Sequence, residues 1–81
     1  MPSPRVRLYA RPDCHLCDEA RAGLEQLHRD GVVFDLEEVD IDSDDELLRR
    51  YLERIPVIEL DGEIFSELFL DADALRAKLR S

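Results

Sequence analysis

Two cysteines, Cys14 and Cys17, are the residues whose type and spacing most directly suggest chemistry. They are the two cysteines of the chain, and only His15 and Leu16 separate them. A disulfide between them would close a loop too small to constrain the unfolded chain appreciably, so it would add little stability. The pair is therefore expected to serve reactivity or metal binding rather than to hold the fold together.

The position of the pair relative to a helix would make its two thiols unequal. If Cys14 lies at a helix start, Cys17 follows one turn later on the same face, where the two sulfurs can meet. The free backbone amides and the positive end of the helix dipole stabilise a thiolate at Cys14. We therefore expect Cys14 to attack a disulfide and Cys17, whose pKa should be higher, to resolve the mixed disulfide.

Four neighbours of the pair are candidates for adjusting its reactivity. A cationic or hydrogen-bonding His15 would lower the pKa of the Cys14 thiol, although His15 can equally be a histidine without a task. Asp13 can cap the helix, and we expect it to modulate that pKa together with His15. Asp18 and Glu19 act in the opposite direction if they lie close, because negative charge disfavours the thiolate.

A metal site is the alternative use of a C-x-x-C pair. Zinc usually takes four ligands. His15 and His28 are the other nearby ligands of suitable chemistry, and the chain has neither a second C-x-x-C nor an H-x-x-x-H pair. We expect no metal site within the chain and no tightly bound cofactor. A metal or iron–sulfur centre held by Cys14 and shared between two chains is kept as an alternative.

Length and charge narrow the remaining possibilities. The 81 residues are expected to form a single domain, 1–81, with a net charge of −9. Eight of the twelve residues from 35 to 46 are acidic and none is basic, so we expect neither nucleic acid nor membrane as a partner. This run is either a solvated face or a docking surface for a basic partner. The start lacks the apolar stretch of a secretion signal, and we expect a cytoplasmic monomer.

Apolar periodicity predicts a strand, a helix and a second strand in the first half of the chain. The strand, which ends in a turn at 11–13, is predicted from three alternating residues, Val6, Leu8 and Ala10. The helix is predicted from one apolar face that consists of Leu16, Ala20, Leu24 and Leu27. Asp13 is expected to cap this helix and Gly31 to follow its end. A strand pattern resumes over 32–39.

A second helix is predicted from a capping box at 43–46. The Ser43 hydroxyl would cap the helix and Glu46 would reach back to it. Glu46 and Arg50 are spaced for an ion pair on one side of this helix. The other side carries three apolar residues, Leu48, Tyr51 and Leu52.

The last third of the chain predicts a hairpin and a final helix. Asp61-Gly62 between the apolar segments 56–60 and 63–65 is typical of a two-residue hairpin turn. Asp71 or Asp73 can cap a helix that turns Leu75 and Leu79 inward. The order is β-α-β-α-β-β-α, which predicts an α/β fold with a four-stranded mixed sheet and helices on both faces.

Four segments together resemble the thioredoxin superfamily and, within it, the glutaredoxin-like branch: 8–20, with its C-x-x-C, then 39–42, 54–57 and 60–62. The compact chain is similar to a family of small bacterial glutaredoxin-like proteins. The resemblance implies that Cys14 is the nucleophile and Cys17 the resolving thiol. It also implies a cis Pro56 that faces the cysteines, and an Ile55 backbone that pairs with bound substrate as an added strand.

The chain departs from glutaredoxins before its last helix. Glutaredoxins carry a Gly-Gly pair and an acidic residue there, which receive the glutamyl end of glutathione. The corresponding segment of this chain, residues 65–71, contains no glycine. We expect Arg11, or Arg54, to hold a substrate carboxylate. Asp71 or Asp73 would replace part of the missing contact.

The expected function is thiol–disulfide exchange through Cys14 and Cys17. The substrates would be protein disulfides or glutathione mixed disulfides, with glutathione as a co-substrate and a thiol or a flavoprotein as reductant. The alternatives are a non-catalytic binding adaptor with the thioredoxin fold and the carrier of a shared metal centre.

Overall fold

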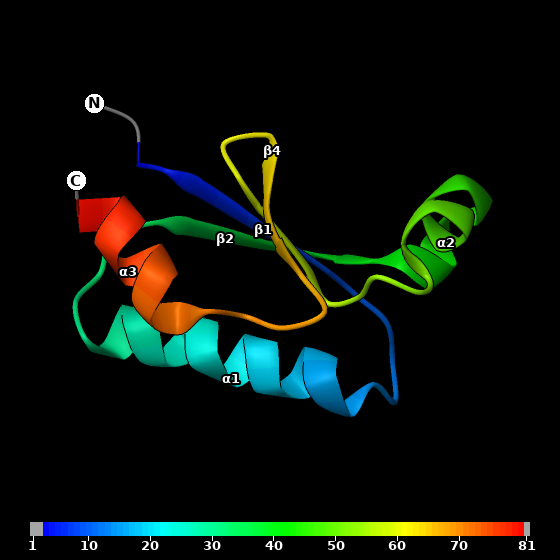
Figure 1. The fold of residues 1–81 in the computed structure, drawn as a ribbon, viewed down its shortest axis with the longest axis horizontal. Helices are drawn as coiled ribbons and strands as arrows, with labels where there is room; N and C mark the ends of the chain where they lie inside the picture. Colours follow the sequence, from blue (N-terminus) through cyan, green and yellow to red (C-terminus); the bar gives the residue numbers. More distant parts are fainter. Residues whose placement is uncertain (1–2, 81) are drawn as a thin grey trace.

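The computed structural model describes residues 3–80, which form four strands, three α-helices and a short 3-10 helix (Figure 1). In chain order these are β1 (Arg5–Ala10), α1 (His15–Arg29), β2 (Asp35–Asp40), the 3-10 helix Ile41–Ser43, α2 (Asp45–Tyr51), β3 (Val57–Leu60), β4 (Glu63–Glu67) and α3 (Ala72–Arg80). The predicted order of strands and α-helices is confirmed.

The four strands form one mixed sheet in the order β2-β1-β3-β4. β1 pairs with β2 in parallel, from Arg5 opposite Asp35 to Ala10 opposite Asp40. β3 is antiparallel to both β1 and β4, and a bulge interrupts its pairing with β4 between Ile58 and Glu59. Because these two strands are parallel, their carboxyl ends, Ala10 and Asp40, lie side by side at the same end of the sheet.

The second strand begins later than its sequence pattern predicts. The Val32 amide donates to the Leu27 carbonyl at 3.0 Å, so this residue still satisfies the end of α1. Gly31 supports this ending with a φ of 88°. Val32 and Phe34 are nevertheless buried in the core. Their apolar character therefore reflects burial rather than strand pairing.

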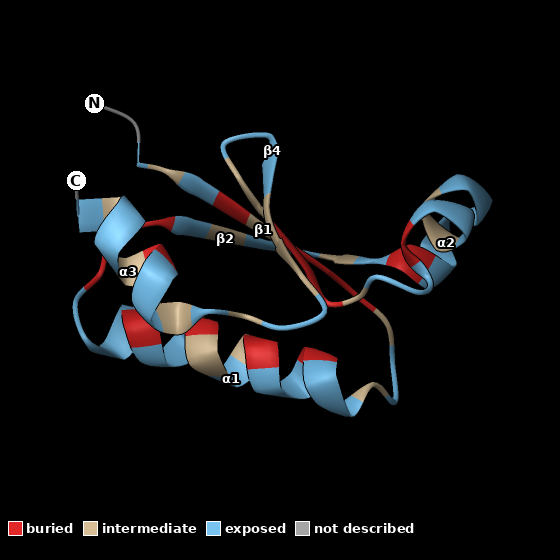
Figure 2. Cartoon of the chain, in the orientation of Figure 1, coloured by how far each residue is buried: buried red, intermediate tan, exposed pale blue. Residues whose placement is uncertain are grey.

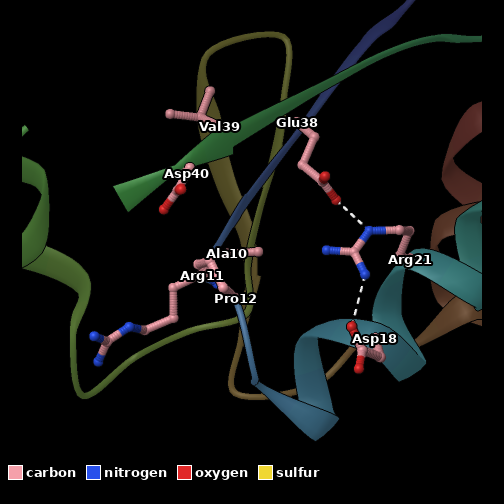
Figure 3. A pocket seen from close by; sticks show the side chains of 8 residues that line it. All are labelled: Ala10, Arg11, Pro12, Asp18, Arg21, Glu38, Val39 and Asp40. Atoms are coloured by element: carbon pink, nitrogen blue, oxygen red, sulfur yellow. Dashed lines mark hydrogen bonds and ion pairs between the residues drawn. The ribbon is translucent and has the colours of Figure 1, made fainter. Parts of the chain in front are cut away.

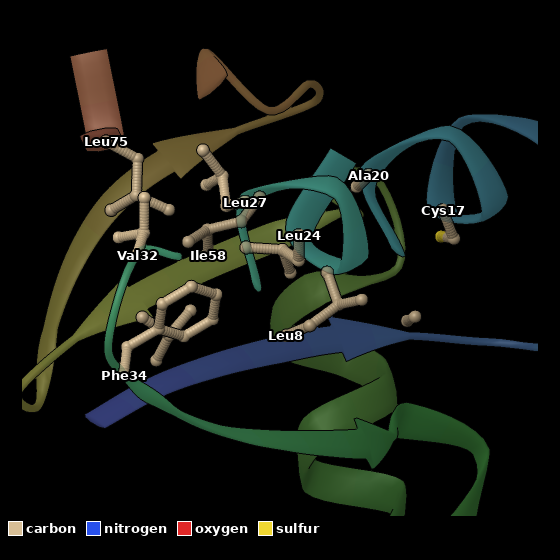
Figure 4. Packing of buried hydrophobic residues seen from close by; sticks show 11 residues of the cluster. Leu8, Cys17, Ala20, Leu24, Leu27, Val32, Phe34, Ile58 and Leu75 are labelled. Carbon is tan, nitrogen blue, oxygen red and sulfur yellow. The ribbon is translucent and has the colours of Figure 1, made fainter. Parts of the chain in front are cut away.

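The main core lies between one face of the sheet and the helices α1 and α3 (Figures 1 and 4). β1 turns alternate residues toward it, namely Val6, Leu8 and Ala10. α1 contributes Cys17, Ala20, Leu24 and Leu27. α3 contributes Leu75, while Leu79 packs against the edge. Figure 2 shows these buried positions on the side of α1 that faces the sheet.

One predicted core position on α1 is wrong. Leu16 is 47% exposed, whereas Cys17 is fully buried. Successive helical residues differ by about 100° around the axis, so the buried stripe that begins at Cys17 leaves Leu16 on its flank. The inward residue of this turn is therefore the cysteine.

A smaller core lies on the opposite face of the sheet and consists of Tyr9, Ile41, Tyr51 and Val57. α2 is short and lies at one end of the sheet (Figure 1). Beyond it this face carries charges, with Arg7 paired to Glu37 at 3.3 Å and to Glu59 at 3.7 Å. Helices thus lie on both faces as predicted, but the second face is covered only in part.

Two details of α2 differ from the prediction. Asp44, not Ser43, caps the helix: its Oδ1 accepts the Glu46 amide at 2.8 Å and the Leu47 amide at 3.3 Å. Ser43 ends the 3-10 helix instead, and its hydroxyl donates to the Asp40 carbonyl at 2.6 Å. Leu52 is 45% exposed rather than inward.

Tyr51, the Glu46–Arg50 pair and the hairpin turn agree with the prediction from the sequence. Tyr51 is buried, and the Glu46–Arg50 ion pair forms at 3.1 Å. The turn residues Asp61 and Gly62 have φ values of 50° and 89°, as a two-residue turn with two positive φ values requires. At the start of α3, Asp71 provides the cap, because its Oδ1 accepts the Ala74 amide at 3.0 Å. Asp73 lies inside the helix.

No helix within residues 3–80 combines the length and the apolar character needed to cross a membrane.

Candidate functional site

Cys14 and Cys17 form a disulfide at the junction between β1 and α1, with their Cα atoms 5.2 Å apart. Cys14 is the cap residue of α1, and its Sγ accepts the Cys17 amide at 3.1 Å. Cys14 is half-buried, whereas Cys17 is fully buried. Solvent therefore reaches part of Cys14 and does not reach Cys17.

The helix start favours negative charge on the sulfur of Cys14. The first amides of a helix have no intrahelical carbonyl partner, and the dipole is positive there. One of these amides already points at Cys14 Sγ, while the Asp18 amide donates to the Cys14 carbonyl at 3.0 Å and begins the helical ladder. This geometry suits a thiolate at Cys14, the form in which a cysteine attacks a disulfide.

Asp13 does not cap the helix, contrary to the prediction. It is exposed and its φ of 59° lies in the left-handed region. That conformation turns the chain so that the cap falls one residue later, on Cys14, and the helix begins at His15. Cys14 therefore caps the same helix start that would stabilise its thiolate. The influence of Asp13 on the thiol pKa stays a prediction.

His15 points into solvent beside the disulfide. Its side chain is 85% exposed, and Nε2 lies 3.2 Å from Glu19 Oε1, one helical turn further on. The carboxylate holds the imidazole at the surface of α1. Its predicted effect on the reactivity of Cys14 also stays a prediction.

The loop before β3 contains Ile55 and Pro56, and the peptide bond between them is cis. Pro56 is buried, and Ile55 packs against both cores. The Ile55 amide donates to the Tyr51 carbonyl at 3.0 Å. Substrate pairing through both backbone groups of Ile55 would therefore require that bond to open.

Arg11 lines a cavity of about 290 Å³ between the β1–α1 connection and β2 (Figure 3). The other lining residues are Ala10, Pro12, Asp18, Arg21, Glu38, Val39 and Asp40. Arg11 Nε lies 3.3 Å from Asp42 Oδ1, and in Figure 3 its guanidinium points away from Arg21.

Both arginines of this cavity are already paired with carboxylates. Arg21 bridges Glu38 and Asp18, and its Nη1 lies 2.7 Å from Asp18 Oδ1. The hydrogen bond with Glu38, followed by the one with Asp18, raises the pKa of Arg21. Arg54, the other predicted carboxylate ligand, has its Nη1 3.7 Å from Glu67 Oε2. A substrate carboxylate would have to compete with a protein carboxylate at either predicted arginine.

An apolar groove of about 130 Å³ lies between α1 and the connection from β4 to α3; we call it the Leu16–Phe69 groove. It is lined by Leu16, Glu19, Ala20, Gly23, Phe69, Leu70 and Ala72. Leu16 stands between the two cysteines, and Phe69 is 60% exposed. The groove therefore starts within the C-x-x-C motif itself.

Residues 5–80 match the family model of the glutaredoxin-like domain (DUF836). The chain belongs to this family. A comparison with curated proteins found no match.

Two solved structures resemble this glutaredoxin-like domain over nearly its full length. Protein Ne2328 from Nitrosomonas europaea is 32% identical, with a TM-score of 0.80 over 96% of this chain and 93% of its own. The structural genomics target XcR50 from X. campestris is 38% identical, with a TM-score of 0.71 over 93% of this chain and 95% of its own.

A thioredoxin shows the same fold at lower identity. A mutant thioredoxin from Halobacterium salinarum is 23% identical, with a TM-score of 0.69 over 98% of this chain and 74% of its own. The predicted thioredoxin-like fold of the glutaredoxin-like domain is confirmed.

Sequence reasoning missed the Leu16–Phe69 groove and the Arg21 bridge of this glutaredoxin-like domain. The apolar run 68–70 just before the last helix was a signal for the groove. Arg21 gave a weaker signal, its i,i+3 spacing from Asp18. Within residues 3–80, no group of three or more His, Cys, Asp or Glu side chains is arranged to hold a metal ion.

Proposed function

We propose that this glutaredoxin-like domain is a thiol–disulfide oxidoreductase that reduces protein disulfides or glutathione mixed disulfides through Cys14 and Cys17. The observation that carries the proposal is the inequality of the two sulfurs. Cys14 is accessible and caps α1, whereas Cys17 is buried one turn away at bonding distance. Nucleophilic attack and resolution require such a pair.

The exchange proceeds in two steps, attack by Cys14 and resolution by Cys17. The Cys14 thiolate attacks one sulfur of the substrate disulfide, forms a mixed disulfide, and expels the other substrate sulfur as a thiolate that takes up a proton. The Cys17 thiol then loses its proton and its thiolate attacks Cys14 Sγ, which releases the second substrate thiolate. The substrate gains two electrons and the protein ends with the Cys14–Cys17 disulfide. A thiol such as glutathione, or a flavoprotein, then returns two electrons to the pair.

The arrangement of the two sulfurs makes the second step fast. Cys17 Sγ needs no diffusion to reach the mixed disulfide, because the helix holds both residues on one face. Its burial keeps it from reacting with external disulfides in place of Cys14. Attack and resolution are thereby assigned to different residues.

The test is single-turnover reduction of a model disulfide peptide by the prereduced protein, with Cys14→Ser and Cys17→Ser as matched variants. We expect Cys14→Ser to release no thiol above background. Cys17→Ser should stop after the first step and accumulate a covalent protein–peptide disulfide that mass spectrometry detects. Equal thiol release by Cys14→Ser and the wild type would refute the proposal and leave the domain as a binding module.

A further inference from the structure

The Leu16–Phe69 groove adjoins the reactive disulfide. Leu16, at 47% exposure, lies between the cysteines in sequence and contributes one wall, and Phe69, at 60%, contributes the other. Covering such exposed apolar side chains with a partner removes them from water, which favours binding. A substrate that presents its disulfide to Cys14 therefore lies next to the groove.

The second wall is held firmly against α1. Gly23 lacks a side chain where Leu70 approaches: a Cβ at Gly23 would lie 2.8 Å from Leu70 Cδ2. Leu68 adopts a φ of 74°, and its amide donates to the Arg54 carbonyl at 3.0 Å and the Pro56 carbonyl at 2.9 Å. These contacts fix the connection between β4 and α3, so the groove is formed before any partner binds.

The rim of the groove is acidic. Glu19 is the one charged residue of its lining. The segment 66–73, which carries Phe69, contains three acidic residues and no basic one. Glu19 pairs with His15 and Glu67 with Arg54, whereas Asp71 and Asp73 form no ion pair within residues 3–80, so these two carboxylates carry the uncompensated charge of the rim. A partner with basic residues beside its apolar ones would complement this rim.

Glutathione is a poor complement for the same surface. It carries two carboxylates and one ammonium group, so it is anionic at neutral pH. The Ala74 amide at the start of α3, a natural partner for a carboxylate, already donates to Asp71 Oδ1 at 3.0 Å. The Leu68 amide is likewise used within the chain.

We propose that the preferred substrate is a protein disulfide within an apolar segment flanked by basic residues, whose apolar side chain enters the Leu16–Phe69 groove while its disulfide meets Cys14. This inference rests on the proposed exchange activity and selects among its substrates. The chemical steps are those given above.

Three disulfide substrates test it with the prereduced protein. Two are peptides of equal length around one cysteine disulfide, one with Leu and Phe flanked by Lys and Arg, the other with Ser in place of the apolar residues and Glu in place of the basic ones. The third is glutathione disulfide. We expect the second-order rate constant for oxidation of the prereduced protein to be at least roughly tenfold higher with the basic apolar peptide than with the other two, since about 1.4 kcal/mol of burial gives a factor of ten.

Three variants connect that preference to the groove. Phe69→Ser should lower the second-order rate constant for the basic apolar peptide roughly tenfold and so remove most of its advantage over the Ser/Glu peptide. Leu16→Ser changes a residue of the C-x-x-C motif, so it is judged by the ratio of the two peptide rates, which should fall by a similar factor. Val33→Ser is the matched control, because Val33 is 68% exposed and follows the other end of α1. It should leave all three rates unchanged. Thermal melts verify that each variant is folded.

Different results would refute the exchange activity and the substrate class. Loss of every difference between the wild type and Cys14→Ser would overturn the exchange activity. Exchange that depends on Cys14 but proceeds as fast with glutathione disulfide as with the basic apolar peptide would overturn the substrate class alone. A peptide preference that survives Phe69→Ser and Leu16→Ser would overturn the role of the groove.

Discussion

The Cys17 amide donates to the Cys14 sulfur at 3.1 Å, so the first turn of α1 is capped by the side chain of Cys14. Oxygen atoms of Ser, Thr, Asp and Asn usually fill this place. Sulfur is a weak acceptor in a thiol or a disulfide and a stronger one when it carries charge. Reduction followed by deprotonation of Cys14 would therefore strengthen the cap as it creates the nucleophile.

We expect the pKa of the Cys14 thiol in the reduced protein to lie below the value of about 8.5 for free cysteine, because the helix start stabilises the thiolate. Ultraviolet absorbance of the thiolate, followed against pH in Cys17→Ser, measures it with one thiol present. Cys14→Ser is the control and reports on buried Cys17, which should titrate at higher pH. A Cys14 that titrates like free cysteine or later would contradict this account.

The place of the cysteine pair could be predicted from sequence, whereas the cap could not. Alternating apolar residues before the pair and helical spacing after it locate the junction of β1 and α1. Asp13 and Cys14 then compete for the cap, and aspartate is the stronger candidate by type. The left-handed φ of Asp13 decides the outcome, and that angle is set by the path of the chain from β1 to α1.

Substitutions on α1 test which leucine the core requires. Leu24 is fully buried, so Leu24→Ala should lower the free energy of unfolding by about 2–5 kcal/mol. Leu16→Ala should cost less than about 1 kcal/mol, because Leu16 is already half in solvent. Urea denaturation of the oxidised proteins measures both. Equal losses would contradict the burial pattern of α1.

The start of α2 offers a second matched pair. Asp44→Ala removes the acceptor of the Glu46 and Leu47 amides and should destabilise the protein by about 1 kcal/mol. Ser43→Ala should cost less, because its hydroxyl donates to the Asp40 carbonyl at the surface and caps nothing. A larger loss for Ser43→Ala in urea denaturation would restore Ser43 as the cap.

The groove depends on contacts that no local pattern contains. Helical spacing groups Leu16 with Ala20, Leu24 and Leu27 on one apolar face, whereas in the structure Cys17 takes the inward position of that turn. The run 68–70 is too short to show a period. Its position follows from Leu70 packing over Gly23 and from the Leu68 amide bonding to Pro56, which are residues distant in sequence.

Tyr9 links the sheet to α2 and gives the fold a dependence on alkaline pH. It is buried, its ring stacks on Tyr51 with centroids 4.6 Å apart, and its hydroxyl donates to Glu59 Oε2 at 3.2 Å. Burial raises the pKa of Tyr9, because the phenolate would lose its hydration. The charge of Glu59 acts in the same direction, and the hydrogen bond from Arg7 opposes it.

The folded pKa of Tyr9 thus exceeds the unfolded value of about 10. The neutral hydroxyl therefore contributes stability that is fully present below about pH 10 and is lost as the pH rises through the folded pKa. We expect the free energy of unfolding of the oxidised protein to fall more steeply above about pH 10 in the wild type than in Tyr9→Phe, which has no hydroxyl to ionise. Urea denaturation from neutral to alkaline pH measures both slopes, and the oxidised state keeps the thiols from titrating. Equal losses of stability in the two proteins would contradict the prediction, because they would show that ionisation of Tyr9 is not coupled to unfolding.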